Sequence, residues 1–242
     1  MLARTSTKLQ RVKVSEIYKK YDGHPGKKRY AVFLLEWFGQ IYTRLRFKVR
    51  VDGIENIPST GSVLIVAKHV RNSDIPLGLV RGIHPARWDV WCIMKDTLAK
   101  GAVANFFLHC GGIPVDRKNP EKSKRDLLLA RKILHDGHLV ALFPEQTHFK
   151  GKMGKGRTPG FRFVIGRPDN PVQVVPLGFD YRFHKFPRRT EVIIRIGKPT
   201  AYDRHSVPEV FLHDRMHEIA ELSGLEYTHE VVTRGKPTKE KT

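Results

Sequence analysis

The spacing of apolar residues near the start of the chain is typical of a helix. Between residues 27 and 47 they recur every three to four positions, at Leu34, Trp37, Phe38, Ile41 and Leu45. Polar residues lie on the opposite side of such a helix, at Glu36, Gln40 and Thr43. The pattern predicts an amphipathic helix over residues 27–47. Its apolar stretch, residues 30–38, is far shorter than the roughly 20 residues that span a bilayer, so we predict no transmembrane helix.

The pattern changes after residue 47 to short apolar runs of strand length. Strands are predicted within residues 47–58, 62–67, 88–94, 112–116, 138–143, 172–179 and 191–197. Helical spacing returns between them, most clearly in residues 121–135 and 208–222. This alternation predicts an α/β fold, with a mostly parallel or mixed sheet flanked by helices and an N-terminal amphipathic helical appendage.

These patterns divide the chain into four segments. Residues 1–26 are polar, basic and end in turn-forming residues, which indicates a flexible lead-in to the 27–47 helix. Residues 48–225 form the expected α/β domain, a size that fits one domain and one active site. The segment 226–242 is charged and is expected to be disordered.

Composition narrows the setting in which the protein works. The chain has 44 Lys and Arg against 24 Asp and Glu, a formal charge of +20, which favours polyanions such as nucleic acid or anionic lipid as partners. Its two cysteines, Cys92 and Cys110, lie in apolar surroundings and indicate buried free thiols in a reducing compartment. The basic N-terminus lacks the apolar core of a secretory signal, so a cytoplasmic location is expected.

Candidate chemistry follows the predicted strand at residues 62–67. His69 and Asp74 come directly after it, at the end of a strand where open α/β sheets place their sites. Five residues along one helix would point the two side chains about 140° apart, so contact between them needs an irregular turn. In such a pair the carboxylate fixes the imidazole tautomer while the other ring nitrogen takes a proton from a hydroxyl. The spacing alone also fits a purely structural role, in which His69 caps a turn and Asp74 caps a helix.

Three further segments follow in a fixed order. They are residues 112–117 (GIPVDR), 143–147 (FPEQT) and 174–177 (VVPL). Together with the His–x4–Asp segment, they resemble the four sequence blocks of the glycerolipid acyltransferase family, typified by 1-acyl-sn-glycerol-3-phosphate acyltransferase. The resemblance covers roughly residues 40 to 200.

The resemblance implies roles for six residues. His69 would be the general base on the acceptor hydroxyl, and Asp74 would orient it. Arg117, Glu145, Thr147 and Gly112 would contribute to binding the acceptor, with Arg117 suited to a phosphate. The implied reaction moves a fatty acyl group from acyl-CoA or acyl carrier protein to a lysophospholipid, most simply the sn-2 hydroxyl of 1-acyl-glycerol 3-phosphate in phospholipid synthesis. Neither a bound cofactor nor a metal is implied.

The sequence departs from the family blocks at four positions. Lys68 stands where Asn is common before the His, Arg71 replaces a frequent Ser, Gln146 replaces Gly and His148 replaces Arg. These changes put acceptor recognition in doubt more than the His–Asp pair. The nearby cations Lys150, Lys152 and Lys155 either supply the missing charge or form a solvated basic loop.

Two other patterns suggest sites that we reject. Residues 151–158 resemble a phosphate-binding loop, but Arg157 stands in place of its Lys, and Pro159-Gly160 follow instead of a clean helix. His213 and His217 are four apart on a predicted helix but lack a third metal ligand at convincing spacing. Surface histidines are the simpler interpretation.

The basic charge is assigned to a membrane surface rather than to nucleic acid. Six aromatic residues lie within residues 27–47 and cations flank them, a combination suited to the headgroup region of an anionic membrane. The alternative is that this helix simply packs onto the sheet. Since no nucleic-acid-binding motif occurs, we expect a peripheral enzyme on the cytoplasmic face of the cell membrane. The remaining alternatives are a different acceptor, or a non-enzymatic basic membrane- or nucleic-acid-binding protein.

Overall fold

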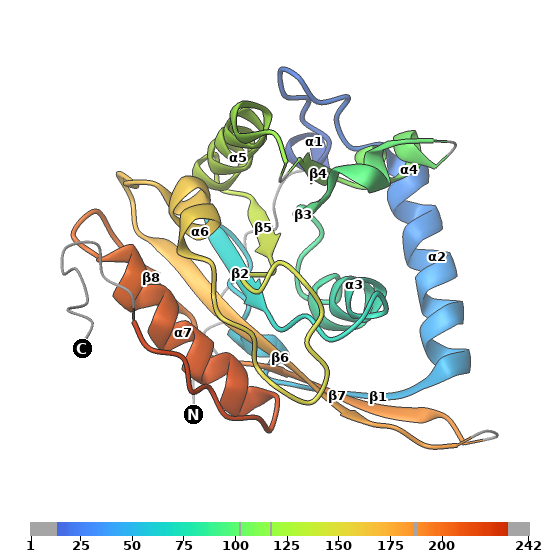
Figure 1. The fold of residues 1–242 in the computed structure, drawn as a ribbon. Helices are drawn as coiled ribbons and strands as arrows, with labels where there is room; N and C mark the ends of the chain where they lie inside the picture. Colours follow the sequence, from blue (N-terminus) through green and yellow to red (C-terminus); the bar gives the residue numbers. More distant parts are fainter. Residues whose placement is uncertain (1–13, 102, 117, 186–187, 232–242) are drawn as a thin grey trace, which may run out of the picture.

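The computed structural model describes residues 14–101, 103–116, 118–185 and 188–231. Its centre is an eight-stranded sheet in the order β1-β7-β6-β2-β5-β3-β4, with β8 paired to β6 (Figure 1). The strands are β1 (Phe47–Asp52), β2 (Val63–Ala67), β3 (Val90–Lys95), β4 (Gly112–Val115), β5 (Leu139–Leu142), β6 (Val172–Arg182), β7 (Thr190–Ile196) and β8 (Thr200–Tyr202).

The sheet is mixed, as predicted. Strands β6, β2, β5, β3 and β4 run parallel to one another, whereas β7 and β8 pair with β6 in the antiparallel sense. All five residues of the central strand β2 are buried, which explains its uninterrupted apolar run. The carboxyl ends of the parallel strands meet at one edge, where the His69–Asp74 segment follows β2 and residues 143–147 follow β5.

Helices cover both faces of this sheet. On one face, α5 (Pro120–His135), α6 (Thr158–Ile165) and α7 (Pro208–Leu222) enclose a core that includes Trp91 and Phe161. The other face is covered by α3 (Asp74–Pro76) and the π-helical segment η2 (Leu77–Ile83), and α2 (Arg29–Arg46) packs outside them. Short elements complete the fold: α1 (Val14–Ile17), η1 (Ile54–Asn56), η3 (Asp96–Ala99) and α4 (Ala104–His109).

Helix α6 corrects one argument from the sequence. Residues 158–165 form a helix directly after the glycine-rich loop, although Pro159-Gly160 argued against one. The proline lies in the first helical turn, where its missing N–H removes no helical hydrogen bond. The substitution of Arg157 for Lys therefore remains as the reason for rejecting a nucleotide-phosphate loop of that class.

The described part of the lead-in packs against the domain. Tyr21 and His24 are buried, and both rings pack edge-on against Trp91. Lys27 is also buried, and its ammonium donates to the backbone carbonyls of Trp88 and Val90. Residues 1–13 lie outside the described part of the chain.

The C-terminal segment likewise remains attached beyond α7. Tyr227 is buried, and its hydroxyl accepts a hydrogen bond from the backbone N–H of Gly156. Residues 226–231 therefore follow α7 as a described segment, and the expectation of disorder for residues 232–242 falls on residues outside the described part. Cys92 and Cys110 are free and only partly buried, rather than fully buried as their surroundings suggested.

Candidate active site

The irregular turn predicted after β2 brings His69 and Asp74 together. Residues 68–73 leave the strand without forming a helix, and α3 begins at Asp74. His69 Nδ1 lies 3.1 Å from Asp74 Oδ2, a hydrogen-bonding distance. The carboxylate therefore orients the ring so that its other nitrogen, Nε2, is left for a substrate.

The Asp74 carboxylate is buried and satisfied by four groups. Besides His69, Oδ2 accepts from the backbone N–H of Val70 at 2.5 Å and of Arg71 at 2.8 Å. Oδ1 accepts from the Tyr181 hydroxyl at 2.5 Å. A carboxylate held by several donors keeps a single position, which in turn fixes the imidazole.

Tyr181 comes from β6 and was not identified from the sequence. Burial, followed by the negative charge of Asp74, raises the pKa of its hydroxyl well above the ordinary range. The group therefore stays protonated at physiological pH and serves as a hydrogen-bond donor. No motif marks it, because it reaches Asp74 from a strand 107 residues further along the chain.

Lys68 and Glu145 form a buried ion pair next to the His69 backbone. Neither the Lys68 nor the Glu145 side chain exposes any surface, and Lys68 Nζ lies 2.9 and 2.8 Å from the two carboxylate oxygens. Lys68 also donates to the carbonyl of Phe149 at 2.9 Å. Although the ion pair opposes it, desolvation lowers the pKa of Lys68.

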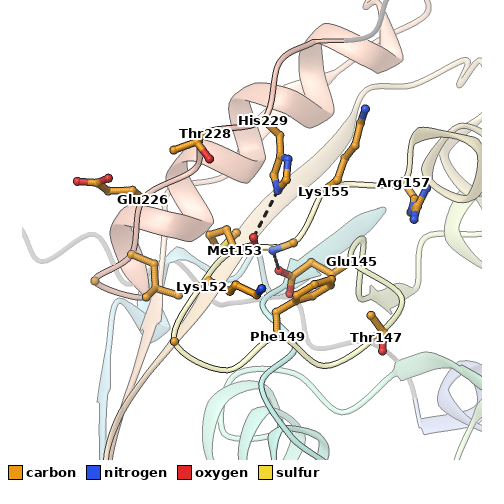
Figure 2. Close-up of a pocket in the computed structure, with 14 residues that line it drawn as sticks. Glu145, Thr147, Phe149, Lys152, Met153, Lys155, Arg157, Glu226, Thr228 and His229 are labelled. Atoms are coloured by element: carbon orange, nitrogen blue, oxygen red, sulfur yellow. Dashed lines mark hydrogen bonds between the residues drawn. The ribbon is translucent and has the colours of Figure 1, made fainter.

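The Glu145 carboxylate connects two loops at the end of the sheet. Oε2 accepts from the backbone N–H of His69 at 3.0 Å, and Oε1 accepts from that of Gly154 at 2.5 Å. A further bond runs from the Phe149 N–H to the His69 carbonyl at 2.9 Å. These contacts tie the backbone of His69 to the loop that contains Phe149 and Gly154, which Figure 2 shows beside Glu145.

Two aromatic rings enclose the imidazole. Phe143 and His148 lie with their ring centroids 4.3 and 4.0 Å from that of His69. Partial burial, followed by electrostatic repulsion between the two imidazoles, lowers the pKa of His148. His148 is therefore mostly neutral at physiological pH and is a poor replacement for the cation of the arginine common at this position.

An apolar cavity of about 470 Å³ opens beside His69. Its walls come from the ends of β3, β4 and β5 and from α5, and its apolar lining is Ile75, Ile93, Met94, Leu98, Val115, Leu127, Leu142 and Phe143. His69, Gln146, Thr147 and His148 form part of its polar lining. The arrangement places a tautomer-fixed imidazole at the edge of a space suited to a hydrocarbon chain.

Comparison with known proteins decides the family. The family model described as "Acyltransferase" matches residues 48–180, more than half of the chain. This chain belongs to the acyltransferase family. The match includes every residue that the resemblance singled out.

This acyltransferase is similar to one relative in sequence and to one solved structure in fold. A Mycobacterium leprae protein described as uncharacterized protein ML2427 is 31% identical over 133 residues, which are 53% of this chain and 34% of that protein. This chain therefore spans about a third of the relative's length. The 1-acyl-sn-glycerophosphate (LPA) acyltransferase PlsC from Thermotoga maritima superposes with a TM-score of 0.59 and 24% identity, over 80% of this chain and 78% of that one. The two share a fold.

The acyltransferase blocks do not all converge on the cavity. Thr147 is exposed and lines it, and its expected contact with the acceptor stays a prediction. Glu145 does not present its carboxylate to the cavity, because Lys68 and two backbone N–H groups engage it. Its position indicates support of the His69 backbone instead of direct acceptor contact.

Gly112 also differs from its expected role. It lies at the start of β4, away from the carboxyl edge, and an added Cβ would lie 2.6 Å from Met94 Sδ. Close packing, rather than substrate contact, accounts for the glycine. Arg117 lies outside the described residues, so its expected phosphate contact stays a prediction.

The third block carries a backbone conformation that explains its usual glycine. Gln146 has φ of +61°, the left-handed region, in a turn closed by its N–H to the Phe143 carbonyl at 3.1 Å. Among the described residues it alone has positive φ without being glycine. In this acyltransferase the turn is kept although the residue type is unfavourable.

Replacing Gln146 with Gly is expected to raise the free energy of unfolding by about 1 kcal/mol. A non-glycine residue in this conformation costs about 1–3 kcal/mol, and the greater unfolded-state entropy of glycine offsets about 0.5–1 kcal/mol of that gain. Chemical denaturation measures the change. Gln146→Ala is the control, since it retains the strain, and an equal gain in both variants would assign the effect to the lost amide instead.

Proposed function

We propose that this acyltransferase moves a fatty acyl group from an acyl thioester to the sn-2 hydroxyl of 1-acyl-glycerol 3-phosphate. The observation that carries the proposal is the His69–Asp74 pair at the edge of the apolar cavity. The cavity suits an acyl chain, and the imidazole suits an attacking hydroxyl. One site therefore offers a space for the acyl chain and a base for the acceptor hydroxyl.

In the proposed reaction, His69 Nε2 removes the proton as the acceptor hydroxyl attacks the thioester carbonyl. A carbon–oxygen bond forms, the carbon–sulfur bond then breaks, and the imidazolium returns its proton to the leaving thiolate. Asp74 stabilises the imidazolium from Nδ1, and Tyr181 and two backbone N–H groups hold Asp74 in place. Lys68 is not assigned to the developing oxyanion, because Glu145 and the Phe149 carbonyl engage its ammonium.

The test of this proposal is an acceptor panel. A labelled long-chain acyl group, supplied on coenzyme A and on acyl carrier protein, is offered with lysophosphatidate, glycerol 3-phosphate and non-phosphorylated lysolipids. Fastest transfer to lysophosphatidate is the expected result, and Arg117→Ala is expected to raise its KM with little effect on non-phosphorylated acceptors. Faster transfer to another acceptor would support acyl transfer but contradict 1-acyl-glycerol 3-phosphate as the substrate. No transfer to any acceptor would contradict the proposed function.

Membrane association is part of the proposal, and the orientation of α2 supports it. The polar side of the helix packs inward: Glu36 bonds His84 at 2.7 Å, and Gln40 bonds Arg81 at 2.9 Å. The apolar side faces outward, with exposed fractions between 41 and 70% at Tyr30, Phe33, Trp37, Phe38, Ile41, Tyr42 and Leu45. A contiguous apolar face of this kind suits insertion into a headgroup region.

The charges around this face favour an anionic membrane. Lys28 and Arg29 at the start of α2, and Arg44 and Arg46 at its end, are exposed and form no ion pair with the described acidic residues. The part of the chain that the structure describes has no helix long and apolar enough to cross a bilayer. From the exposed apolar side of α2 and these flanking cations, we propose peripheral binding to the cytoplasmic face of the membrane.

Binding to anionic vesicles is expected to weaken by about tenfold or more in the double variant Phe33→Ser/Leu45→Ser, because two exposed apolar anchors are lost. Sedimentation with anionic and neutral vesicles measures this. The matched control is Leu128→Ser/Phe163→Ser, which removes two exposed apolar side chains from α5 and α6. Equal losses in the two variants, or no preference for anionic lipid, would contradict a docking role for α2.

A further inference from the structure

A strongly basic surface lies at the outer end of β6 and β7, and the proposed reaction does not use it. The two strands pair in the antiparallel sense as far as Arg182 and Glu191 and extend away from the centre of the sheet (Figure 1). Residues 183–189 connect them, and of these the structure describes 183–185 and 188–189. Every described residue of this connection is exposed.

A cavity of about 350 Å³ opens beside the connection. It is lined by Lys48 from β1, Glu191 from β7, and His184, Arg188 and Arg189 from the connection. The Lys48 ammonium lies 3.0 Å from the Glu191 carboxylate and holds the pKa of that carboxyl below its usual value. The two arginines form no ion pair with the described acidic side chains. Because the single carboxylate of the lining is already paired, the cavity keeps the positive charge of two guanidinium groups.

One of these guanidinium groups is held in place. Arg189 Nη1 donates to the backbone carbonyl of Arg44 at 2.8 Å, in the last turn of α2. Carbonyls in the last turn of a helix lack a helical donor, so this bond satisfies an acceptor that would otherwise need water. A guanidinium carries further N–H donors in a rigid fork, and these stay available to an anion.

The basic cavity adjoins the apolar side of α2. Thr190 pairs with Phe47, the residue directly after α2, so the connection lies where the helix ends. Leu45, in that last turn, exposes 70% of its surface. At the other end of the connection Phe183 is 57% exposed, and its ring stacks on Tyr181 at a centroid distance of 5.5 Å. Exposed apolar side chains thus occur at both ends of the connection, next to its cations.

We infer that this cavity binds the phosphate of an anionic phospholipid headgroup, so that the membrane contacts the β6–β7 connection as well as α2. Arginine suits a phosphate because its planar fork can donate parallel hydrogen bonds to the phosphate oxygens. An aromatic ring such as Phe183 suits the apolar boundary next to the headgroups. A membrane is favoured over nucleic acid because the neighbouring apolar side chains gain from contact with acyl chains and gain nothing from a phosphodiester backbone.

The second contact changes what membrane binding does. A single helix lying in the interface leaves the domain free to rotate about the helix axis, whereas a second contact at the end of that helix restricts this rotation. Strand β6 also carries Tyr181, whose hydroxyl donates to Asp74. The strand that ends at the lipid contact is therefore part of the active site, and the membrane fixes the orientation of His69 toward a lipid acceptor.

This inference rests on the proposed membrane association, and its test separates the two. Sedimentation measures binding of the full chain to vesicles of phosphatidylcholine and to vesicles that also contain phosphatidylglycerol. The variant Arg188→Gln/Arg189→Gln is expected to weaken binding to the mixed vesicles by about tenfold or more, and to change binding to phosphatidylcholine by less than about twofold. Acyl transfer to an acceptor supplied below its critical micelle concentration should stay unchanged, since neither arginine contacts the active site.

Two further variants make the test specific. Arg167→Gln/Arg204→Gln removes two exposed arginines that follow α6 and β8, away from α2, and neither pairs with an acidic residue in the part of the chain that the structure describes (Figure 1). It is expected to change binding to the mixed vesicles by less than about twofold. Arg189→Lys keeps the charge but loses the fork, and is expected to weaken that binding by about threefold. Unchanged binding in Arg189→Lys would contradict a phosphate held by this guanidinium.

Other results would also overturn the inference. Equal weakening in Arg188→Gln/Arg189→Gln and in the matched control would show diffuse attraction between charges. Tighter binding to duplex DNA than to mixed vesicles, lost in the same variant, would assign the cavity to nucleic acid, and slower transfer to the dispersed acceptor would assign it to the active site. Weaker vesicle binding in Phe33→Ser/Leu45→Ser alone would leave docking by α2 standing and remove this site. Conversely, binding that depends on the two arginines, in a protein that transfers no acyl group, would support the site and contradict the proposed function.

Discussion

Replacing His69 with alanine is expected to lower kcat for acyl transfer by about 10²–10⁴-fold, the range that a positioned general base contributes. The side chain is only partly buried, at 14% exposure, so the fold should survive its removal. Circular dichroism and denaturation of the same preparation establish that the variant is folded. Transfer at the wild-type rate by folded His69→Ala would exclude this residue as the base.

The neighbours of His69 should show a graded response. Asp74→Asn is expected to lose most of the activity, because an amide at this position no longer stabilises the imidazolium. Tyr181→Phe removes only one of the donors to Asp74 and should lower kcat less, by about tenfold. A larger loss in Tyr181→Phe than in Asp74→Asn would indicate that the tyrosine hydroxyl contacts substrate directly.

Glu145→Ala is expected to destabilise the protein by about 3–5 kcal/mol, because it leaves the buried Lys68 ammonium without its counter-ion. Two backbone N–H groups, of His69 and Gly154, also lose their acceptor. Urea denaturation measures the loss. Activity should fall as well, since the loop next to the histidine is no longer held.

The double variant Lys68→Met/Glu145→Leu provides the matched comparison. Replacing a buried ion pair with apolar residues of similar volume is often neutral, so the double variant should recover much of the stability that Glu145→Ala loses. It should not recover activity, because the His69 N–H still lacks its acceptor. A double variant as unstable as the single one would show that the hydrogen bonds to the backbone, not the ion pair, carry the stability.

The sequence predicted the fold class and the contact between His69 and Asp74, because both depend on local signals. Continuous apolar runs mark buried parallel strands, and the fixed order of blocks places His69 and Asp74 after one of them. Tyr181 could not be predicted, since a tyrosine in a strand is ordinary and only the pairing of β6 with β2 brings it near. Long-range contacts of this kind leave no pattern in a single sequence.

Further features were not predicted because tertiary contacts outweigh local sequence preferences. Charged residues are normally solvated, so the sequence did not predict that Lys68 and Glu145 pair with each other in the interior. Helix α6 was missed because Pro159 and Gly160 were taken as helix breakers. Strand β8 has only three residues, too few to show a period.

The inward polar side of α2 reverses the rule by which substitutions in a surface helix are usually judged. Glu36 and Gln40, which would be tolerant positions on an ordinary amphipathic helix, hold it to the domain through His84 and Arg81. The large apolar residues opposite contribute little to folding, because they remain exposed. In a collection of random variants, selection for folding alone would therefore retain polar replacements at Phe33 or Leu45 and remove apolar ones at Glu36. If α2 docks on a membrane as proposed, selection for acyl transfer would remove both kinds of replacement.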